Sequence, residues 1–375
     1  MQTTDPESTD NRATREAYPP RLGIFQTLAR LALIGIALAA VAGTFAYLGG
    51  WLTPDELTPA RFVDAFESVD GAHSGFRRNH AKGVGVSGFF ESNGNGVSLS
   101  KAVVFQPGRI RVLGRFSLSG GQPDVADKMD TVRGLGLEFS LPDGELWRTA
   151  MINLPVFLVN TPEAFYERLI ASKPDPASRK PDPDKMKVFL EHHPETARAL
   201  TVIKSQQFSS SFANSTFHGL NAFRFINSAG ASRPVRWLMT PEQPFVAAST
   251  RSAPPDRNYL FDELIATIRR QPLRWHLVVI VGQPSDPTNT AAVAWPEERE
   301  KIDVGTLTLD QVESDETRAA TDINFDPLVL PAGIVPSDDP LLSARSAVYS
   351  QSFTRRAGEP KQPSAIAPLG VPKGE

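Results

Sequence analysis

Residues 77–90 read Arg-Arg-Asn-His-Ala-Lys-Gly-Val-Gly-Val-Ser-Gly-Phe-Phe, and the interpretation of the whole chain starts from this stretch. One histidine, His80, follows two arginines and precedes a run of small residues. The glycines in this run let the backbone approach something large and flat, because glycine carries no Cβ. Arg77, and Arg115 further along the chain, suit carboxylate recognition, since a guanidinium forms paired charge-assisted hydrogen bonds. We expect these residues to form one side of a ligand site.

A second stretch, residues 345–349, reads Arg-Ser-Ala-Val-Tyr and lies in a segment, residues 338–349, that is predicted to be helical. Arg345 and Tyr349 are four residues apart, so they share one face of that helix. A free phenol has a pKa of about 10. A neighbouring cation favours the charged form, so this tyrosine can serve a metal ion as a phenolate.

The composition excludes several classes of function. The chain has 375 residues and no cysteine, which excludes disulfides, thiolate ligands, cysteine-based zinc sites and a cysteine nucleophile. The formal net charge is -3, and no basic stripe offsets it, which argues against a nucleic-acid partner.

The N-terminal part predicts a membrane segment. Residues 28–51 are almost wholly apolar, and the uncharged part, residues 31–51, exceeds the roughly 18 to 20 residues that cross a bilayer. Arginines precede it and acidic residues follow it, so residues 1–27, expected to be disordered, would be cytoplasmic. The prediction is an inner-membrane anchor with the following domain on the periplasmic or extracellular side. The alternative is a signal peptide cleaved near residues 37–39, Ala-Leu-Ala, with secretion to the periplasm.

Residues 54–356 predict one α+β domain of many short antiparallel strands, closed as a barrel. Turn residues separate the strands. They are expected at residues 97–105, 110–117, 134–140, 150–159, 216–226, 234–239, 275–281 and 305–312. Helices are expected at residues 54–70, 161–170, 185–199, 262–268 and 338–349. The tail, residues 357–375, is rich in Pro and Gly and is expected to be disordered.

Residues 77–90 resemble the distal-histidine segment of the haem catalase family. Further matches follow in order from residue 62 to residue 356: Arg-Phe-Ser at 115–117, Arg-Gly-Leu-Gly-Leu-Glu-Phe at 133–139, Pro-Val-Phe at 155–157, Asn-Phe-Asp-Pro at 324–327 and Arg-x-x-x-Tyr at 345–349. The chain is shorter than full catalases and resembles the small catalase-related peroxidases. The resemblance implies a haem-dependent catalase-like fold, an antiparallel β-barrel core with surrounding helices, here preceded by one transmembrane helix.

For the site, the resemblance implies haem b with an axial tyrosinate. Tyr349 would bind the iron, with Arg345 stabilising its charge. His80 would take a proton from the peroxide and return it to the leaving oxygen, and Ser117 would hold the imidazole in one tautomer. The other implied cofactor-binding residues are arginines for the propionates and aromatics of the distal channel: Arg77, Arg115, Arg356, Phe157 and Phe165.

The chain departs from the family pattern at the catalytic asparagine, which falls at Ile152, while Asn153 lies one position later. Neighbouring residues of a strand face opposite sides, so two interpretations remain open. Either Asn153 points at the iron and is catalytic, or Ile152 leaves the pocket without an amide. A second departure is Asn79, a polar residue where many catalases carry an apolar gate.

Both departures favour a haem peroxidase that reduces hydrogen peroxide or an organic hydroperoxide with a small organic electron donor, with weak catalase activity. Three alternatives stay open: a catalase proper, a lipid-hydroperoxide isomerase and a non-catalytic haem binder. The predicted partners are the peroxide, the donor and the membrane, with a homodimer as one possible assembly.

Overall fold

The structure is a computed structural model, and it describes residues 23–48, 52, 56–178, 180–250, 256–313 and 322–366. The chain divides into two compact units, Met1–Thr58 and Pro59–Glu375. In the first unit, α1 (Ile24–Leu48) is long and apolar enough to cross a membrane, by length and composition. This helix overlaps the predicted segment, residues 28–51, and begins four residues before it. The disorder predicted for residues 1–27 is wrong for residues 24–27, which belong to α1. Residues 1–22 lie outside the described residues.

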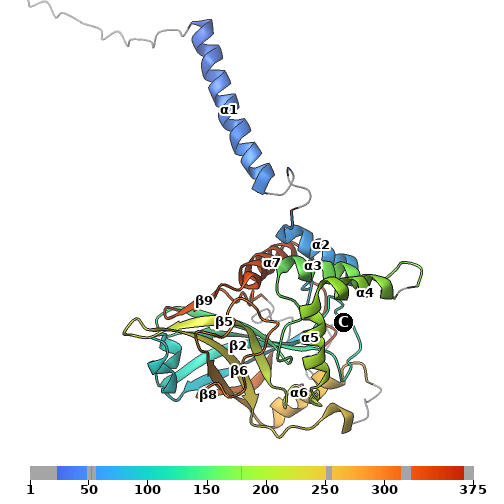
Figure 1. The fold of residues 1–375 in the computed structure, drawn as a ribbon, viewed down its shortest axis with the longest axis vertical. Coiled ribbons are helices and arrows are strands. Elements are labelled where there is room, and N and C mark those ends of the chain that lie inside the picture. The colour runs from blue at the N-terminus through green and yellow to red at the C-terminus, as the bar shows by residue number, and fades with distance from the viewer. Residues whose placement is uncertain are drawn as a thin grey trace, which may run out of the picture. The chain divides into compact units, whose positions relative to one another are not determined.

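The second unit is built on a closed antiparallel barrel (Figure 1). Its strands follow one another around the barrel in chain order, and β8 returns to pair with β1. The strands are β1 (Gly83–Ser92), β2 (Gly108–Leu118), β3 (Arg133–Ser140), β4 (Leu146–Ile152), β5 (Phe217–Ile226), β6 (Ser232–Pro241), β7 (Leu273–Val281) and β8 (Lys301–Glu313). The barrel closes between β4 and β5, where Ile152 pairs with His218. A short strand, β9 (Ile334–Pro336), adds to β5. The predicted antiparallel barrel is confirmed.

Aromatic side chains fill the barrel core. Strand residues alternate between the two faces, and β7 shows this directly, because every second side chain from Leu273 to Val281 is buried. The ring centroids of Phe139 and Trp147 lie 4.7 Å apart. Trp237 Nε1 donates to Thr149 Oγ1 at 3.0 Å, so this indole keeps a hydrogen bond inside the core.

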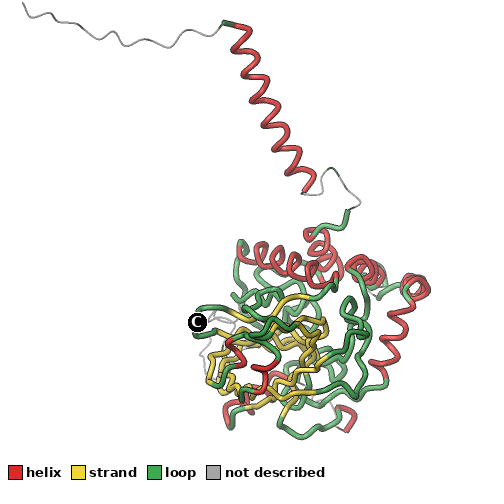
Figure 2. The backbone as a smooth tube through the Cα atoms, turned by 60° about the vertical axis from the view of Figure 1, so that its left-hand side comes forward, coloured by secondary structure: helices red, strands yellow, loops and turns green. Residues whose placement is uncertain are grey.

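Helices gather on one side of the barrel, as Figures 1 and 2 show. Three helices contact one another: α2 (Pro59–Asp70), α3 (Pro162–Ala171) and α7 (Pro340–Ala357). A fourth helix, α4 (Pro183–His192), contacts both α3 and α5 (Pro194–Lys204). α6 (Tyr259–Arg270) packs against β8. Single-turn 3₁₀ helices occur at η1 (Asn95–Ser98), η2 (Val103–Phe105) and η3 (Ala248–Thr250).

Ion pairs attach α2 to the end of the chain. Arg78 Nε donates to Glu67 Oε1 at 2.7 Å, and the same guanidinium pairs with Glu359. Arg355 reaches Asp64 at 2.8 Å and Glu67 at 3.0 Å. Apart from Arg78–Glu67, these pairs join residues almost 300 positions apart in the sequence, so they fix α2 against α7 and the residues after it.

Three expectations from the sequence are wrong. Residues 97–105 form two 3₁₀ turns rather than a strand, because this segment bridges β1 and β2 and pairs with neither. The strand expected at residues 150–159 ends at Ile152, and the rest is irregular. The tail is not disordered from residue 357 onward, since Ile366 is buried in the main core. Residues 367–375 lie outside the described part.

Candidate active site

A cavity lies between the barrel and the helices α2, α3 and α7, with an empty volume of about 1470 Å³ that includes its open part. Every predicted site residue except Asn153 lines it. Two opposed sides matter for chemistry. We call Arg345, Tyr349 and Arg356, all on α7, the helix wall. We call Ser117, Gly134, Ile152 and His218, together with His80, the strand wall.

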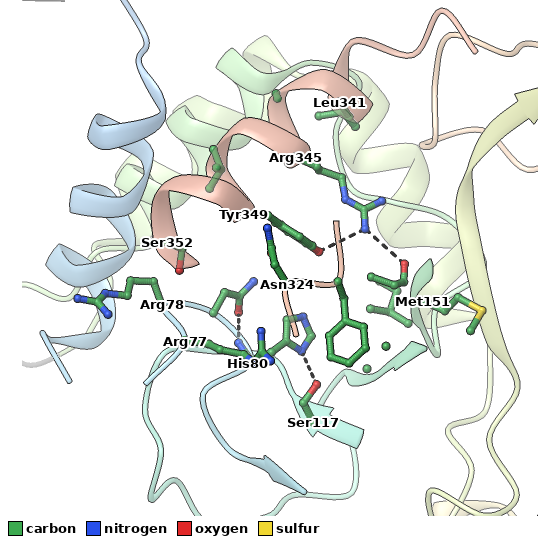
Figure 3. Close-up of a pocket in the computed structure, with 18 of the residues that line it drawn as sticks. Arg77, Arg78, His80, Ser117, Met151, Asn324, Leu341, Arg345, Tyr349 and Ser352 are labelled. Atoms are coloured by element: carbon green, nitrogen blue, oxygen red, sulfur yellow. Dashed lines mark hydrogen bonds between the residues drawn. The ribbon is translucent and has the colours of Figure 1, made fainter. Parts of the chain in front are cut away.

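The helix wall follows from local spacing. Asp339 caps α7 by accepting from the Leu341 backbone N–H at 2.9 Å, and Pro340 occupies the first turn. Arg345 and Tyr349 then fall on one face, and Arg345 Nη2 donates to the Tyr349 hydroxyl at 3.3 Å (Figure 3). Arg356, seven residues beyond Tyr349, continues that face and is buried.

Further partners orient the Arg345 guanidinium. It donates to the backbone carbonyl of Ala150 on β4 at 3.3 Å and to the side-chain carbonyl of Asn221. Asn221 in turn donates to Asp339 Oδ2 at 2.8 Å. Burial raises the pKa of Asp339, and the hydrogen bond from Asn221 opposes that rise. The capping residue of α7 is thus linked to the tyrosine through two side chains.

The strand wall carries His80 in an unusual backbone conformation. Its φ is 59°, and it is the one non-glycine residue with positive φ in the described part of the chain. Asn79 Oδ1 accepts from the His80 backbone N–H at 3.0 Å and from the Gly120 N–H at 2.8 Å. The side chain expected to act as a polar gate therefore uses its oxygen to hold the turn that presents His80.

The imidazole of His80 is fixed from the barrel side. Its Nδ1 lies 3.0 Å from Ser117 Oγ, which leaves Nε2 for the cavity. Gly134 lies beneath the ring, and a Cβ there would come within 3.0 Å of it. Burial, followed by the charges of Arg115, Arg77 and Arg345, lowers the pKa of His80 to about 3. The ring is therefore neutral at physiological pH and can accept a proton.

Arg77 and Arg115 line the cavity, and both also donate hydrogen bonds to backbone carbonyls. Arg115 donates to the carbonyls of His80 at 2.8 Å and Ala81 at 2.9 Å, so it braces the segment that carries the histidine. Gly83 makes room for this guanidinium, because a Cβ at Gly83 would come within 2.6 Å of it. Arg77 donates to the Ile323 carbonyl at 2.9 Å and lies over the Phe325 ring.

The structure resolves the choice between Ile152 and Asn153 in favour of Ile152. Ile152 lines the cavity, and Asn153 does not. The Asn153 side-chain oxygen accepts from the Arg133 backbone N–H at 2.8 Å, where it closes the end of the β3–β4 pair. The geometry therefore contradicts a catalytic Asn153, because it does not line the cavity and its side-chain oxygen already accepts a backbone hydrogen bond.

Three residues of the site escaped the sequence analysis. Asn221 and Asp339 orient Arg345, and His218 lines the cavity. Asp339 carried a signal as the predicted helix start. For Asn221 and His218 the signal lies in the barrel register, which one sequence does not reveal.

Comparisons with known proteins agree with this geometry. The family model described as Catalase matches residues 55–363. A catalase-related peroxidase of Synechococcus elongatus is 38% identical over 86% of this chain and 96% of its own length. A catalase-related peroxidase of Mycolicibacterium paratuberculosis is 33% identical over 83% of this chain and 97% of its own length.

Solved structures support the fold alone. Catalase A from Saccharomyces cerevisiae aligns with a TM-score of 0.69 at 19% identity, over 76% of this chain and 62% of that one. This chain thus spans less than two thirds of the yeast chain, whereas it spans nearly all of the two peroxidases. The chain belongs to the catalase family.

Proposed function

We propose that the protein is a haem peroxidase that reduces hydrogen peroxide or an organic hydroperoxide at the expense of an organic electron donor. The observation that carries the proposal is the opposition of the two walls. Tyr349 with its arginine lies on the helix wall, and a neutral, oriented His80 lies on the strand wall beside Ile152. The two relatives named catalase-related peroxidases point to the same activity.

The residues present fit a haem. The cavity combines a phenol, five arginines and the aromatic side chains of Phe157, Phe165 and Phe325. This donor set suits an iron ion, two carboxylates and an apolar ring system. Tyr349 would bind the iron as tyrosinate, and Arg77, Arg115 and Arg356 would bind the propionates. When bound, the haem supplies the iron at which the peroxide O–O bond breaks and through which two electrons from the donor return.

The role of the strand wall is proton transfer. His80 Nε2 accepts the proton of the peroxide and delivers it to the oxygen that leaves, so that the products are water or an alcohol. Ser117 holds Nδ1 and fixes the ring. Ile152 offers no hydrogen bond to a second peroxide, which favours reduction by an organic donor over release of oxygen. A catalase proper is the second candidate, because the histidine and tyrosine are both in place.

We also propose that α1 anchors the protein in the inner membrane, with the haem domain on the periplasmic side. The length of α1 and the arginines that precede it support this, and cleavage as a signal peptide is the alternative. Carbonate extraction of membranes, followed by an N-terminal mass determination, distinguishes the two. An anchored chain stays in the pellet at full length, whereas a cleaved chain is soluble and shorter.

The activity is tested by the absorption spectrum of the purified protein before and after one equivalent of hydrogen peroxide. A haem spectrum typical of tyrosinate ligation, which changes with peroxide and returns only with a phenolic donor, supports a peroxidase. Rapid return with oxygen release and no donor supports a catalase. Haem without any response to peroxide supports a non-catalytic binder. With a lipid hydroperoxide, a peroxidase yields the alcohol, whereas an isomerase yields rearranged lipid.

A further inference from the structure

The strand wall carries a second imidazole. Four residues lie opposite one another on successive antiparallel strands: Ser117 pairs with Gly134, Gly134 with Ile152, and Ile152 with His218. Directly paired residues share one face of a sheet. All four line the cavity. His218 therefore stands in the same row as Gly134, on which the His80 ring rests.

The distance between neighbouring strands in this row keeps His218 well away from His80. Neighbouring strands are about 4.8 Å from each other, so His218 is about 10 Å from Gly134. Ile152 lies between them. This is too far for both imidazoles to bind the same pair of peroxide oxygens. An aromatic ring with a polar substituent would fit the space between them, with its flat side on the apolar Ile152 side chain.

His218 has a hydrogen-bonding capacity that the fold does not use. Its side chain is half-buried, and no hydrogen bond or ion pair joins it to another described residue. By contrast, His80, His73, His193 and His276 each have a polar partner. An imidazole that lines a cavity without a partner from the described residues is available to hydrogen-bond with a ligand there.

The charge state of His218 indicates which class of ligand it would bind. Burial lowers the pKa of His218 to about 4, so the ring is neutral and offers one N–H donor and one nitrogen acceptor. A neutral imidazole matches a hydroxyl group, which also donates one hydrogen bond and accepts others. An anionic carboxylate would instead favour the arginines of the cavity.

We propose that His218 is the residue that binds the electron donor, and that the donor is a phenol whose ring lies on Ile152 and whose hydroxyl hydrogen-bonds to the imidazole. This inference rests on the proposed peroxidase function and names its second substrate class. His80 serves the peroxide, and His218 serves the phenol. Ile152 separates the two binding positions on one wall.

The test is calorimetric titration of guaiacol into the purified, haem-loaded protein without peroxide. The matched ligand is 1,2-dimethoxybenzene, which has a similar ring and no hydroxyl. His218→Leu removes the hydrogen bond, His218→Gln keeps one, and His192→Leu, at an exposed position in α4, is the control. We expect the guaiacol Kd to rise about tenfold in His218→Leu, the effect of one lost hydrogen bond. It should change less than about threefold in His218→Gln, which corresponds to a fraction of that hydrogen bond.

The outcomes separate the inference from the proposed function. An unchanged guaiacol Kd in His218→Leu overturns the inference, and so does an equal loss of affinity for both ligands, which would indicate altered cavity shape. In turnover, the inference predicts a raised KM for guaiacol and an unchanged KM for peroxide. If the wild-type protein takes up no haem, the proposed function fails, and guaiacol binding to the haem-free cavity still tests His218.

Discussion

The helix wall and the strand wall are built by different physics. On the helix wall, Arg345 and Tyr349 meet because they are one helical turn apart, and their hydrogen bond needs only a formed α7. On the strand wall, His80 meets Ser117 across 37 positions, and Ile152 meets His218 where the barrel closes. Local spacing therefore fixes the side that would bind the metal, and long-range register fixes the side that would handle the substrates.

This comparison predicts that the largest effect comes from the helix wall. Tyr349→Phe removes the oxygen that would bind the iron and leaves the ring. We expect loss of the tyrosinate spectrum, low haem content and a loss of peroxide turnover above about 1,000-fold, equivalent to about 4 kcal/mol. Absorption spectra and haem assays measure this.

Tyr166→Phe is the control for the tyrosine variant, because Tyr166 lies on α3 against Phe62 and does not line the cavity. A Tyr349→Phe protein with the wild-type spectrum and activity would show that the helix wall does not bind the metal.

The second-largest effect should come from the strand wall, and it distinguishes the roles of the two walls. His80→Gln removes the proton acceptor of the strand wall and leaves α7 intact, so haem content should stay near that of the wild type. We expect the rate of peroxide cleavage to fall about 10²–10⁴-fold, the range for loss of a general acid–base group. Stopped-flow spectroscopy measures the rate. Equal loss of haem in this variant and in Tyr349→Phe would contradict a division of labour between the walls.

The strand wall should also make the protein sensitive to acid. His80 and His218 have pKa values that burial lowers to about 3 and about 4, below the ordinary histidine value of 6.5. Between pH 6.5 and these values the unfolded state binds more protons, so the free energy of unfolding falls as the pH falls. At pH 5 the loss is roughly 2 kcal/mol for each histidine, at about 1.4 kcal/mol per pKa unit.

Urea unfolding at pH 7.5 and pH 5 tests this acid sensitivity. The double variant His80→Gln, His218→Gln should lose less stability between the two pH values than the wild type does. His192→Gln, at an exposed position, should behave as the wild type. Equal losses in the double variant and the wild type would mean that the two imidazoles are not neutral in the folded protein.

The same division explains which parts of the site can be read from the sequence. The cap at Asp339, the Arg345–Tyr349 pair and the helix after Thr161 follow from patterns within a few residues, and the structure has all three. The barrel class follows from the alternation and number of short strands. These features depend on local spacing, which a single sequence contains.

The features that one sequence does not determine depend on where a strand ends. Apart from Asn153, residues 150–159 are apolar, so the sequence does not show that β4 stops at Ile152. That end decides which of Ile152 and Asn153 faces the cavity, and the bond from Arg133 to Asn153 that fixes it is made to another strand. The sequence does not reveal the place of His218 in the site for the same reason, since its neighbour in space is Ile152 on β4.

A smaller effect tests whether Ile152 determines the balance between oxygen release and reduction by an organic donor. Ile152→Asn places an amide on the strand wall between His80 and His218. We expect the oxygen released per peroxide consumed to rise about tenfold, because one added hydrogen bond to a second peroxide is worth about 1.4 kcal/mol at most. An oxygen electrode measures it. Ile152→Leu is the control and should leave the ratio unchanged. No rise in Ile152→Asn would mean that another feature limits oxygen release.

The smallest effect concerns the turn that presents His80. A left-handed conformation costs a non-glycine residue about 1–2 kcal/mol, and Asn79 Oδ1 offsets this by accepting from two backbone N–H groups. Asn79→Val removes the acceptor at similar size, so the turn relaxes and Nε2 leaves its position. We expect peroxide cleavage to slow about fivefold and the protein to lose about 1 kcal/mol of stability. Asn79→Asp keeps the oxygen and should restore both. If Asn79→Val and Asn79→Asp slow cleavage equally, the acceptor oxygen does not position His80.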